Sequence, residues 1–177
     1  AEHDTGAGHP ERAARIEAVD AALSGVSWSR RLRKEAPRAT KEQLSRVHAG
    51  GYVDLILENI PEDGYANLDP DTVLSPGTGE AALRAAGAII SAVDDVVAGT
   101  VDNAFCAVRP PGHHAEPEHG MGFCFFNNVA VGAQHARGVH GLQRVAIVDF
   151  DVHHGNGTQA AFCDDPNTLF ASTHQLP

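Results

Sequence analysis

The chain has 177 residues and carries 13 Lys and Arg against 23 Asp and Glu, so its formal net charge is −10 with its 11 His neutral. Its 42% hydrophobic and 20% charged residues are typical of a globular domain and exclude a disordered chain or a coiled coil. A chain of this length buries roughly 70% of its unfolded surface, enough for one hydrophobic core. The acidic excess argues against direct nucleic-acid binding, which rests on Lys and Arg, and favours a cationic substrate.

The sequence predicts a cytoplasmic protein without membrane contact. No apolar run approaches the ~20 residues of a membrane-spanning helix, and the first residues lack the basic and apolar stretches of a secretion signal. The cysteines, Cys106, Cys124 and Cys163, are odd in number and widely spaced. We therefore expect reduced thiols rather than disulfides or a zinc knuckle.

The first 100 residues are expected to be mainly helical. Helix predictions rest on apolar residues at helical spacing, on Pro and Gly at the ends of such patterns, and on one capping box. Clustered Asn, Pro, Asp and Gly predict a loop. In order, the predicted features are a helix over 10–24, a solvated basic helix face over 30–34, a helix start at Thr40 with Gln43, a long surface loop over 59–80 and a helix over 79–98.

The second part, residues 101–177, follows a strand–helix–strand–helix–strand pattern. Continuous apolar strands linked by helices indicate a parallel sheet that is covered on both faces, and hence an α/β fold in a single domain. Ligands of such sheets bind beyond the carboxyl ends of the strands. The predicted strands cover 104–108, 144–149 and 168–172, and the predicted helices cover 127–137 and 158–162.

Polar clusters follow the first two predicted strands at these ends. His113 and His114 follow the first strand, and Asp149, Asp151 and His153 follow the second. If the backbone stays extended, the last three side chains project to one side, because side chains alternate with period two. Carboxylate oxygen with imidazole nitrogen suits Zn²⁺, and also Fe²⁺ or Mn²⁺.

These groups predict metal-assisted amide hydrolysis. A catalytic zinc takes three protein ligands, so a third donor is needed, and His174 after the third strand is one candidate. A metal ion lowers the pKa of its water towards ~7, and the tandem His113 and His114 can accept a proton and deliver it to a leaving amine. Asp149 and Asn156 are available to orient the second ring nitrogens.

The motifs at 109–115, 122–128 and 149–159, together with His9-Pro-Glu-Arg and His48-x-x-x-Tyr52, resemble the histone deacetylase superfamily in its class II-like branch with bacterial members. The resemblance implies a three-layer arginase/deacetylase-like α/β fold, of which this chain has the N-terminal and central part. It also implies a metal site, an acid–base pair and a substrate tunnel. The implied zinc ligands, with iron(II) as the alternative metal, are Asp151 and His153; the acid–base pair is His113 and His114, with Asp149 orienting His113 and Asn156 near His114.

The resemblance implies two further sites. Gly122 and Phe123 resemble the wall of the acyl-lysine tunnel, and Asp69 or Asp71 in the predicted loop would hold the substrate backbone. A structural K⁺ would bind the backbone oxygens of Asp149, Asp151, His153 and Thr173 and the Ser172 hydroxyl.

Two departures from the family pattern change the expectations. Asn156 stands where another branch has Asp, which alters the charge around His114. Two residues of the family pattern would fall after Pro177: a later Asp, which is the third metal ligand, and the Tyr that polarises the substrate carbonyl. Tyr52 does not replace that Tyr, because it lies ahead of every predicted strand. The chain therefore resembles a piece of a longer enzyme. Expressed alone, it is expected to be nearly inactive and to aggregate or need a partner, which leaves a homo-oligomer open.

The sequence thus predicts a zinc-dependent deacetylase that acts on acetyl-lysine of proteins or on acetylated polyamine-like amines. A non-catalytic acyl-lysine-binding module is the alternative. An arginase-like ureohydrolase is disfavoured, because it needs two Mn²⁺ ions and more carboxylates around the His. A purely structural α/β domain would show no metal requirement.

Overall fold

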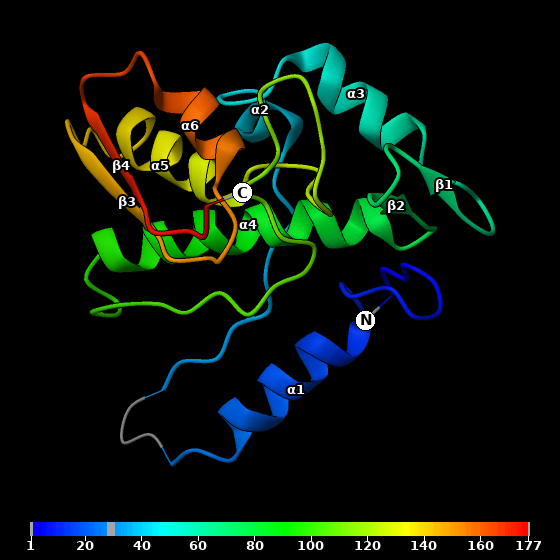
Figure 1. Cartoon of the computed structure of the whole chain (residues 1–177). Coiled ribbons are helices and arrows are strands. Elements are labelled where there is room, and N and C mark those ends of the chain that lie inside the picture. Colours follow the sequence, from blue (N-terminus) through cyan, green and yellow to red (C-terminus); the bar gives the residue numbers. More distant parts are fainter. Residues whose placement is uncertain (1, 28–30, 177) are drawn as a thin grey trace.

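The computed structural model describes residues 2–27 and 31–176. Helices make up most of the regular structure, and the strands form two small sheets (Figure 1). None of the described helices is long and apolar enough to cross a membrane. In chain order the elements are α1 (Ala13–Ser24), α2 (Lys41–Leu44), α3 (Gly50–Glu58), β1 (Ala66–Asn67), β2 (Val73–Leu74), α4 (Thr78–Val97), α5 (Asn128–Gly138), β3 (Val145–Asp149), α6 (Asn156–Phe162) and β4 (Thr168–Ser172).

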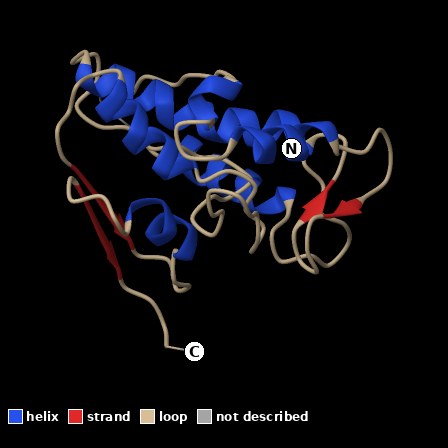
Figure 2. Cartoon of the chain, turned by 90° about the horizontal axis from the view of Figure 1, so that it is seen from above, coloured by secondary structure: helices blue, strands red, loops and turns tan. Residues whose placement is uncertain are grey.

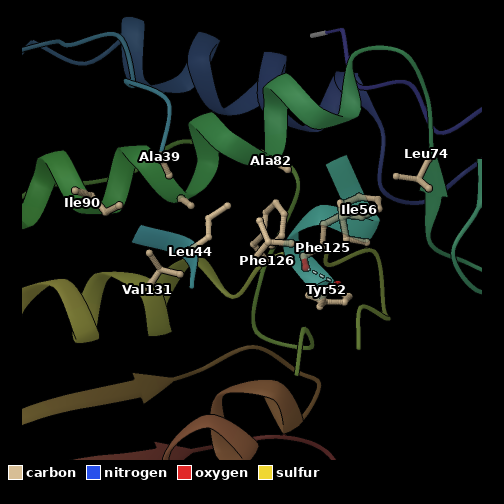
Figure 3. Packing of buried hydrophobic residues seen from close by; sticks show 12 residues of the cluster. Ala39, Leu44, Tyr52, Ile56, Leu74, Ala82, Ile90, Phe125, Phe126 and Val131 are labelled. Carbon is tan, nitrogen blue, oxygen red and sulfur yellow. Dashed lines mark hydrogen bonds between the residues drawn. The ribbon is translucent and has the colours of Figure 1, made fainter. Parts of the chain in front are cut away.

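The main hydrophobic core lies between α4 and the segments that pack on it. Phe125 and Phe126 are fully buried there, in one cluster with Leu44 of α2 and residues of α3 (Figure 3). α4 and α5 pack closely, because Gly132 of α5 has no Cβ and Ile89 of α4 fills the space that a Cβ would take. The core thereby fixes both ends of the segment that links α4 to α5.

β3 and β4 form a parallel pair with α6 between them in the chain, which agrees with the α/β class predicted from the sequence. The register runs from Val145 opposite Thr168 to Asp149 opposite Ser172, so both strands end at the same level. Figure 2 shows this pair at one end of the molecule and the antiparallel β1–β2 hairpin at the other. Asp149 and the residues after it therefore leave the carboxyl end of a parallel sheet, where the sequence predicts a ligand site.

The predicted strand over 104–108 is wrong. This run forms no strand in the structure, and within the described part of the chain no backbone hydrogen bond joins it to another segment. It lies instead beside α4 and residues 31–36, where the three line a surface groove, and Phe105 is 73% exposed. A strand needs a neighbouring strand to take its hydrogen bonds, and none of the described segments provides one here.

The predicted cover on both faces of the sheet is also wrong for the described residues. One face packs on α5 and α6 through a cluster of Ile147, Ala130 and Phe162, whereas Val148 and Leu169 on the other face are 65% and 62% exposed. One side of the sheet is thus apolar and open.

Two predictions for the first 100 residues need correction. Residues 31–34 of the basic run form no helix; Arg33 and Lys34 pair instead with Asp20 and Asp95, and Arg30 lies outside the described residues. The predicted loop over 59–80 contains the β1–β2 hairpin. The capping box at Thr40 is present as predicted, with side chain and backbone of Thr40 and Gln43 bonded reciprocally.

Candidate active site

Three separate segments meet at the carboxyl end of β3. The loop after β3 carries Asp151 and His153, α6 begins with Asn156, and the segment before α5 carries the two tandem histidines. The buried Asn127 joins these parts, since its amide nitrogen donates to the carbonyl of Ala115 at 3.2 Å and to the hydroxyl of Thr158 at 3.1 Å. Hydrogen bonds of a buried polar side chain therefore hold these segments together.

His113 is paired with Asp149. Its Nδ1 lies 2.8 Å from Oδ2 of Asp149, and both side chains are largely buried. Because an ionised carboxylate only accepts, Nδ1 of His113 is the donor and Nε2 is the free nitrogen. Gly155 permits this pairing, since a Cβ at this position would overlap the Asp149 carboxylate.

His114 is paired with an amide rather than a carboxylate. Its Nδ1 lies 2.7 Å from Oδ1 of Asn156, and its ring centroid lies 4.0 Å from that of His113. Burial lowers the pKa of His114, helped by the nearby rings of His113 and His153, and outweighs the opposing hydrogen bond that His114 donates to Asn156. The two adjacent histidines thus have different hydrogen-bond partners.

His114 also depends on a close backbone approach. Gly122 has φ +56, and a Cβ there would lie 2.5 Å from Cδ2 of the His114 ring. The next residue, Phe123, has φ +68, which is uncommon for a bulky side chain. The turn at 121–124 therefore combines a strained backbone with direct contact to the His114 ring.

Asp151 and His153 offer an oxygen and a nitrogen donor side by side. Oδ1 of Asp151 lies 3.0 Å from Nδ1 of His153 and also accepts the His153 backbone N–H at 2.8 Å. Burial raises the pKa of Asp151, but the hydrogen bonds from His153 and the field of His113 outweigh it and lower the pKa. The carboxylate is therefore ionised and, like the His153 side chain, remains about half exposed.

This donor set fits part of a divalent metal site. An ionised carboxylate and an imidazole suit zinc or iron(II), and the exposed side of the pair leaves room for further ligands. The ring centroids of His114 and His153 are 6.0 Å apart, so a metal ion at Asp151 and His153 would lie next to the histidine pair. The described residues supply two of the three donors that such a site needs.

His174 does not supply the third donor in this structure. Its Nδ1 lies 2.8 Å from the Ser172 hydroxyl, and its ring packs at a tilt against that of His154, with ring centroids 4.6 Å apart. The hydroxyl of Ser172 is therefore engaged with a side chain, while the Thr173 N–H donates to the Asp149 carbonyl at 3.0 Å. Of the five residues implied for K⁺, Asp149 lies opposite Ser172 in the strand register and is bonded to Thr173, while Asp151 and His153 follow Asp149 in the loop.

The segments implied for the substrate tunnel also meet. The N–H of Phe123 donates to the Thr72 hydroxyl at 3.1 Å, which brings the loop at 69–72 to the turn at 121–124. Asp69 accepts the backbone N–H groups of Asp71 and Thr72, and its pKa is lowered by these bonds against the effect of burial. The pKa of Asp71 is raised by burial and by the neighbouring Asp69 carboxylate.

His9, which the sequence singled out only as part of a family motif, also lies at this wall. The ring of His9 packs edge-on against Phe123 with centroids 4.9 Å apart, and its Nε2 lies 3.1 Å from the Asp71 carbonyl. The N-terminal segment thus forms part of the same wall.

Tyr52, as expected, is not at the site. It is buried in α3, and its hydroxyl donates to the Phe125 carbonyl at 2.7 Å, the dashed bond in Figure 3. Burial raises its pKa.

A second His and Asp cluster was missed by the sequence analysis. Donor atoms of Asp94, His135 and His140 lie within 4.8 Å of one another, and each His Nε2 is 2.7 Å from the same Asp94 oxygen. Arg46 lies 2.8 Å from Nδ1 of His135. A guanidinium only donates, so Nδ1 accepts and Nε2 of the neutral ring carries the hydrogen that Asp94 accepts. We therefore read this cluster as a hydrogen-bonded link between α4 and α5, not as a metal site.

Comparison with known proteins gives a consistent result. The histone deacetylase domain family matches residues 9–177. The chain is 43% identical over 172 residues to a histone deacetylase-like amidohydrolase of Pseudomonas aeruginosa, covering 96% of this chain and 44% of that protein. It is 44% identical over 149 residues to the polyamine deacetylase HDAC10 of Homo sapiens, covering 81% and 22%. A crystal structure of the HDA15 HD domain has a TM-score of 0.87 at 40% identity and covers 98% of this chain and 49% of that chain. The chain thus spans less than half the length of these relatives.

Proposed function

The chain belongs to the histone deacetylase domain family, and on that premise we propose that it forms the part of a metal-dependent deacetylase that carries the acid–base pair and two metal ligands. The proposed reaction is removal of an acetyl group from an amine by hydrolysis of the amide bond. The P. aeruginosa relative is named a deacetylase-like amidohydrolase and the human one a polyamine deacetylase. Their names support the reaction class.

One observation carries this proposal: two adjacent imidazoles with different orienting partners face a carboxylate–imidazole donor pair. His113 is held by Asp149 at 2.8 Å, His114 by Asn156 at 2.7 Å, and Asp151 lies beside His153 at 3.0 Å. A structural role alone does not call for two separate clusters of partly buried titratable groups that converge in this way.

The side chains suggest how the proton would move. Asp149 fixes the His113 ring so that Nε2 is free to take the proton that an attacking water loses. His114, with its lowered pKa, is neutral near neutral pH, so its Nε2 is a second position that can first accept the proton lost by the water and then release it to the leaving amine. A zinc or iron(II) ion, when bound by Asp151 and His153, would supply Lewis acidity that lowers the pKa of a water.

The remaining assignments are part of the same proposal. Gly122, Phe123 and the loop with Asp69 and Asp71 would form the acyl-chain channel, supported by the Phe123–Thr72 hydrogen bond. The carbonyl oxygens around Asp149, with Ser172 and Thr173, would hold K⁺, supported by their proximity in the strand register. The substrate would be acetyl-lysine or an acetylated polyamine, since either gives a cationic amine that the net charge of −10 favours.

A cytoplasmic location stays a prediction. One relative, histone deacetylase 14 of Arabidopsis thaliana, is chloroplastic by name.

The test compares this chain with a longer form that continues through its downstream coding sequence. Metal content is measured together with hydrolysis of a fluorogenic acetyl-lysine peptide and of an acetylated polyamine. We expect about one zinc per chain and chelator-sensitive hydrolysis in the longer form, loss of both in Asp151→Ala, and near-inactivity of the 177-residue chain.

Other outcomes separate the alternatives. Stoichiometric binding of acetylated peptide by the longer form without hydrolysis would establish a non-catalytic binding module. Hydrolysis at ordinary enzyme rates by the 177-residue chain would overturn the expected dependence on a third ligand. A preference between peptide and polyamine would set the substrate class.

A further inference from the structure

Glu116 lies behind Asn156 on the side away from His114. The Asn156 amide nitrogen donates to Oε1 of Glu116 at 2.9 Å, while Oδ1 of Asn156 faces Nδ1 of His114 at 2.7 Å. The same amide nitrogen also lies 3.4 Å from the His114 carbonyl and 3.5 Å from the Met121 sulfur. Glu116, Asn156 and His114 thus form a chain of hydrogen bonds in which Glu116 reaches His114 only through Asn156.

The backbone of Glu116 is fixed on both sides. Its N–H donates to the carbonyl of His119 at 2.8 Å, and its carbonyl accepts from Nδ1 of the buried His48 at 3.1 Å. Nε2 of His48 in turn accepts the backbone N–H of Asn127 at 2.9 Å. Because both backbone groups are bonded, the carboxylate is anchored within reach of Asn156.

This contact decides which way the Asn156 amide points. The two ends of an amide have nearly the same shape, but one donates two hydrogens and the other only accepts. A carboxylate only accepts, so it holds the NH₂ end and directs the oxygen towards His114. With the opposite orientation, the Asn156 oxygen would face the Glu116 carboxylate and the NH₂ group would face Nδ1 of His114.

The amide orientation decides the tautomer of His114. An oxygen facing Nδ1 requires a hydrogen on Nδ1, which leaves the Nε2 lone pair of the neutral ring free. An NH₂ group facing Nδ1 would place the hydrogen on Nε2 instead. The two tautomers differ in whether Nε2 accepts or donates, so the amide orientation sets what His114 can do.

From this arrangement we propose that Glu116 is a positioning residue that fixes the Asn156 amide and thereby keeps the neutral His114 in the Nδ1–H tautomer. It touches neither of the two proposed metal ligands and acts only through Asn156. Its consequence for catalysis rests on the proposed function, whereas its effect on the His114 ring does not.

The direct test is ¹⁵N NMR of the imidazole nitrogens in the metal-free longer form of the chain, with the His114 signals identified by their loss in His114→Gln. Glu116→Gln keeps an oxygen that can accept from Asn156, and Glu116→Met has similar length but no acceptor. Glu118→Met, two residues on and exposed, is the matched control. We expect the Nδ1–H tautomer in the wild type, Glu116→Gln and Glu118→Met, and a mixture or the Nε2–H tautomer in Glu116→Met, with thermal unfolding showing that each variant folds.

Activity is the second measurement, made on the longer form of the chain. We expect kcat to fall at least tenfold in Glu116→Met with little change in KM, and to recover to within about threefold of wild type in Glu116→Gln. If Glu116→Met keeps the wild-type tautomer, the inference is wrong even when the enzyme hydrolyses acetylated substrates. If the longer form hydrolyses nothing, the proposed function fails while the NMR result still decides the role of Glu116. If Glu116→Met does not fold, Glu116→Gln decides alone: the Nε2–H tautomer of His114 in that variant would overturn the inference.

Discussion

At the scale of single residues, the site depends on positions where a backbone must come close to a catalytic ring. Gly122 shows this most clearly, because its φ of +56 and the missing Cβ both serve the contact with His114. Neither property is visible as a catalytic signal in the sequence, where Gly122 resembles only part of a tunnel motif.

Substitution of Gly122 by Ala should therefore displace the His114 ring and lower activity more than it lowers the stability of the fold. We expect kcat/KM of the longer form to fall about 100-fold, because an error of ~1 Å in the placement of a catalytic ring has an effect of that size. The free energy of unfolding should fall by about 1–2 kcal/mol, because Ala is strained in the left-handed backbone conformation. Gly141→Ala is the control, because Gly141 has φ +69 but open space around its Cβ position. Equal loss of activity in both variants would show that backbone strain, and not the contact with His114, is responsible.

The protonation of His48 makes the stability of the fold depend on pH. Burial lowers its pKa from 6.5 to about 4, against the opposing effect of its hydrogen bonds to the backbone of Glu116 and Pro117. Between these values the unfolded chain binds a proton that the folded chain does not, so stability falls as pH drops from 6.5 towards 4 and the effect levels off below that. The contribution of this group is on the order of 3 kcal/mol.

Urea unfolding of the wild type at pH 7, 5.5 and 4.5 measures this loss. His48→Gln has no titrating ring, so its stability should change less over the same range even if it is lower at every pH. A pH slope that is the same in both proteins would show that other groups cause the acid sensitivity.

At the scale of elements, the N-terminal segment is fixed to the site by a buried ion pair. Glu11 is fully buried, and both of its carboxylate oxygens accept from the Arg109 guanidinium. Burial raises the pKa of Glu11, but His3 and Arg109 outweigh it and lower the pKa to about 2. Arg109 begins the segment that ends in the tandem histidines, so this pair joins two distant parts of the chain.

Glu11→Gln should cost about 3–5 kcal/mol of stability, because it leaves the largely buried Arg109 cation without its charged partner. Thermal or urea unfolding measures the loss. Glu17→Gln on the exposed face of α1 is the matched control and should change stability by less than about 0.5 kcal/mol. A loss below about 1 kcal/mol in Glu11→Gln would mean that the pair adds little beyond its own desolvation cost.

Elements with a local signal were predicted well, and those that need a distant partner were not. The helix predicted over 79–98 is α4, Thr78–Val97, and the last predicted strand coincides with β4, since apolar spacing and a stop at Gly are properties of the segment itself. The run at 104–108 has the same apolar character but forms no strand, because strand pairing is decided elsewhere in the chain. The basic run at 30–34 was predicted wrongly for the opposite reason: Arg33 and Lys34 pair with Asp20 and Asp95, which are not their neighbours in the sequence.

The site residues divide in the same way: those that belong to local motifs were predicted, and those that link distant segments were not. The motifs placed His113, His114, Asp151 and His153 in two segments, and strand geometry predicted that Asp151 and His153 follow the carboxyl end of a strand. The segment with His113 and His114 follows no strand and is joined to that end by side-chain hydrogen bonds such as the one from His113 to Asp149. The links between them were not predictable from spacing. Asn127, His48 and Glu116 act through buried or partly buried hydrogen bonds between residues 31 to 79 positions apart, for which a single sequence carries no signal.

At the scale of the whole molecule, the β3–β4 sheet leaves one apolar face open among the described residues. Ala146 and Val148 of β3 lie opposite Leu169 and Ala171 of β4, and all four side chains are exposed. Phe150, just after β3, is 88% exposed. A continuous apolar strip beside an unpaired strand edge favours association with another surface.

We therefore expect the chain, studied alone, to self-associate in a concentration-dependent way and to bind a hydrophobic dye. Val148→Lys with Leu169→Glu places opposite charges on neighbouring strands of this face, and it should shift sedimentation towards the monomer and reduce dye binding several-fold. Leu55→Lys is the control, since Leu55 is 49% exposed on α3, away from the sheet, and should leave association unchanged. A wild-type chain that stays monomeric at high concentration and melts in one sharp transition would show that this apolar face does not drive assembly. If Leu55→Lys dissociates the assembly as well as the sheet variant does, general net charge is the cause, because the face itself is then not specifically required.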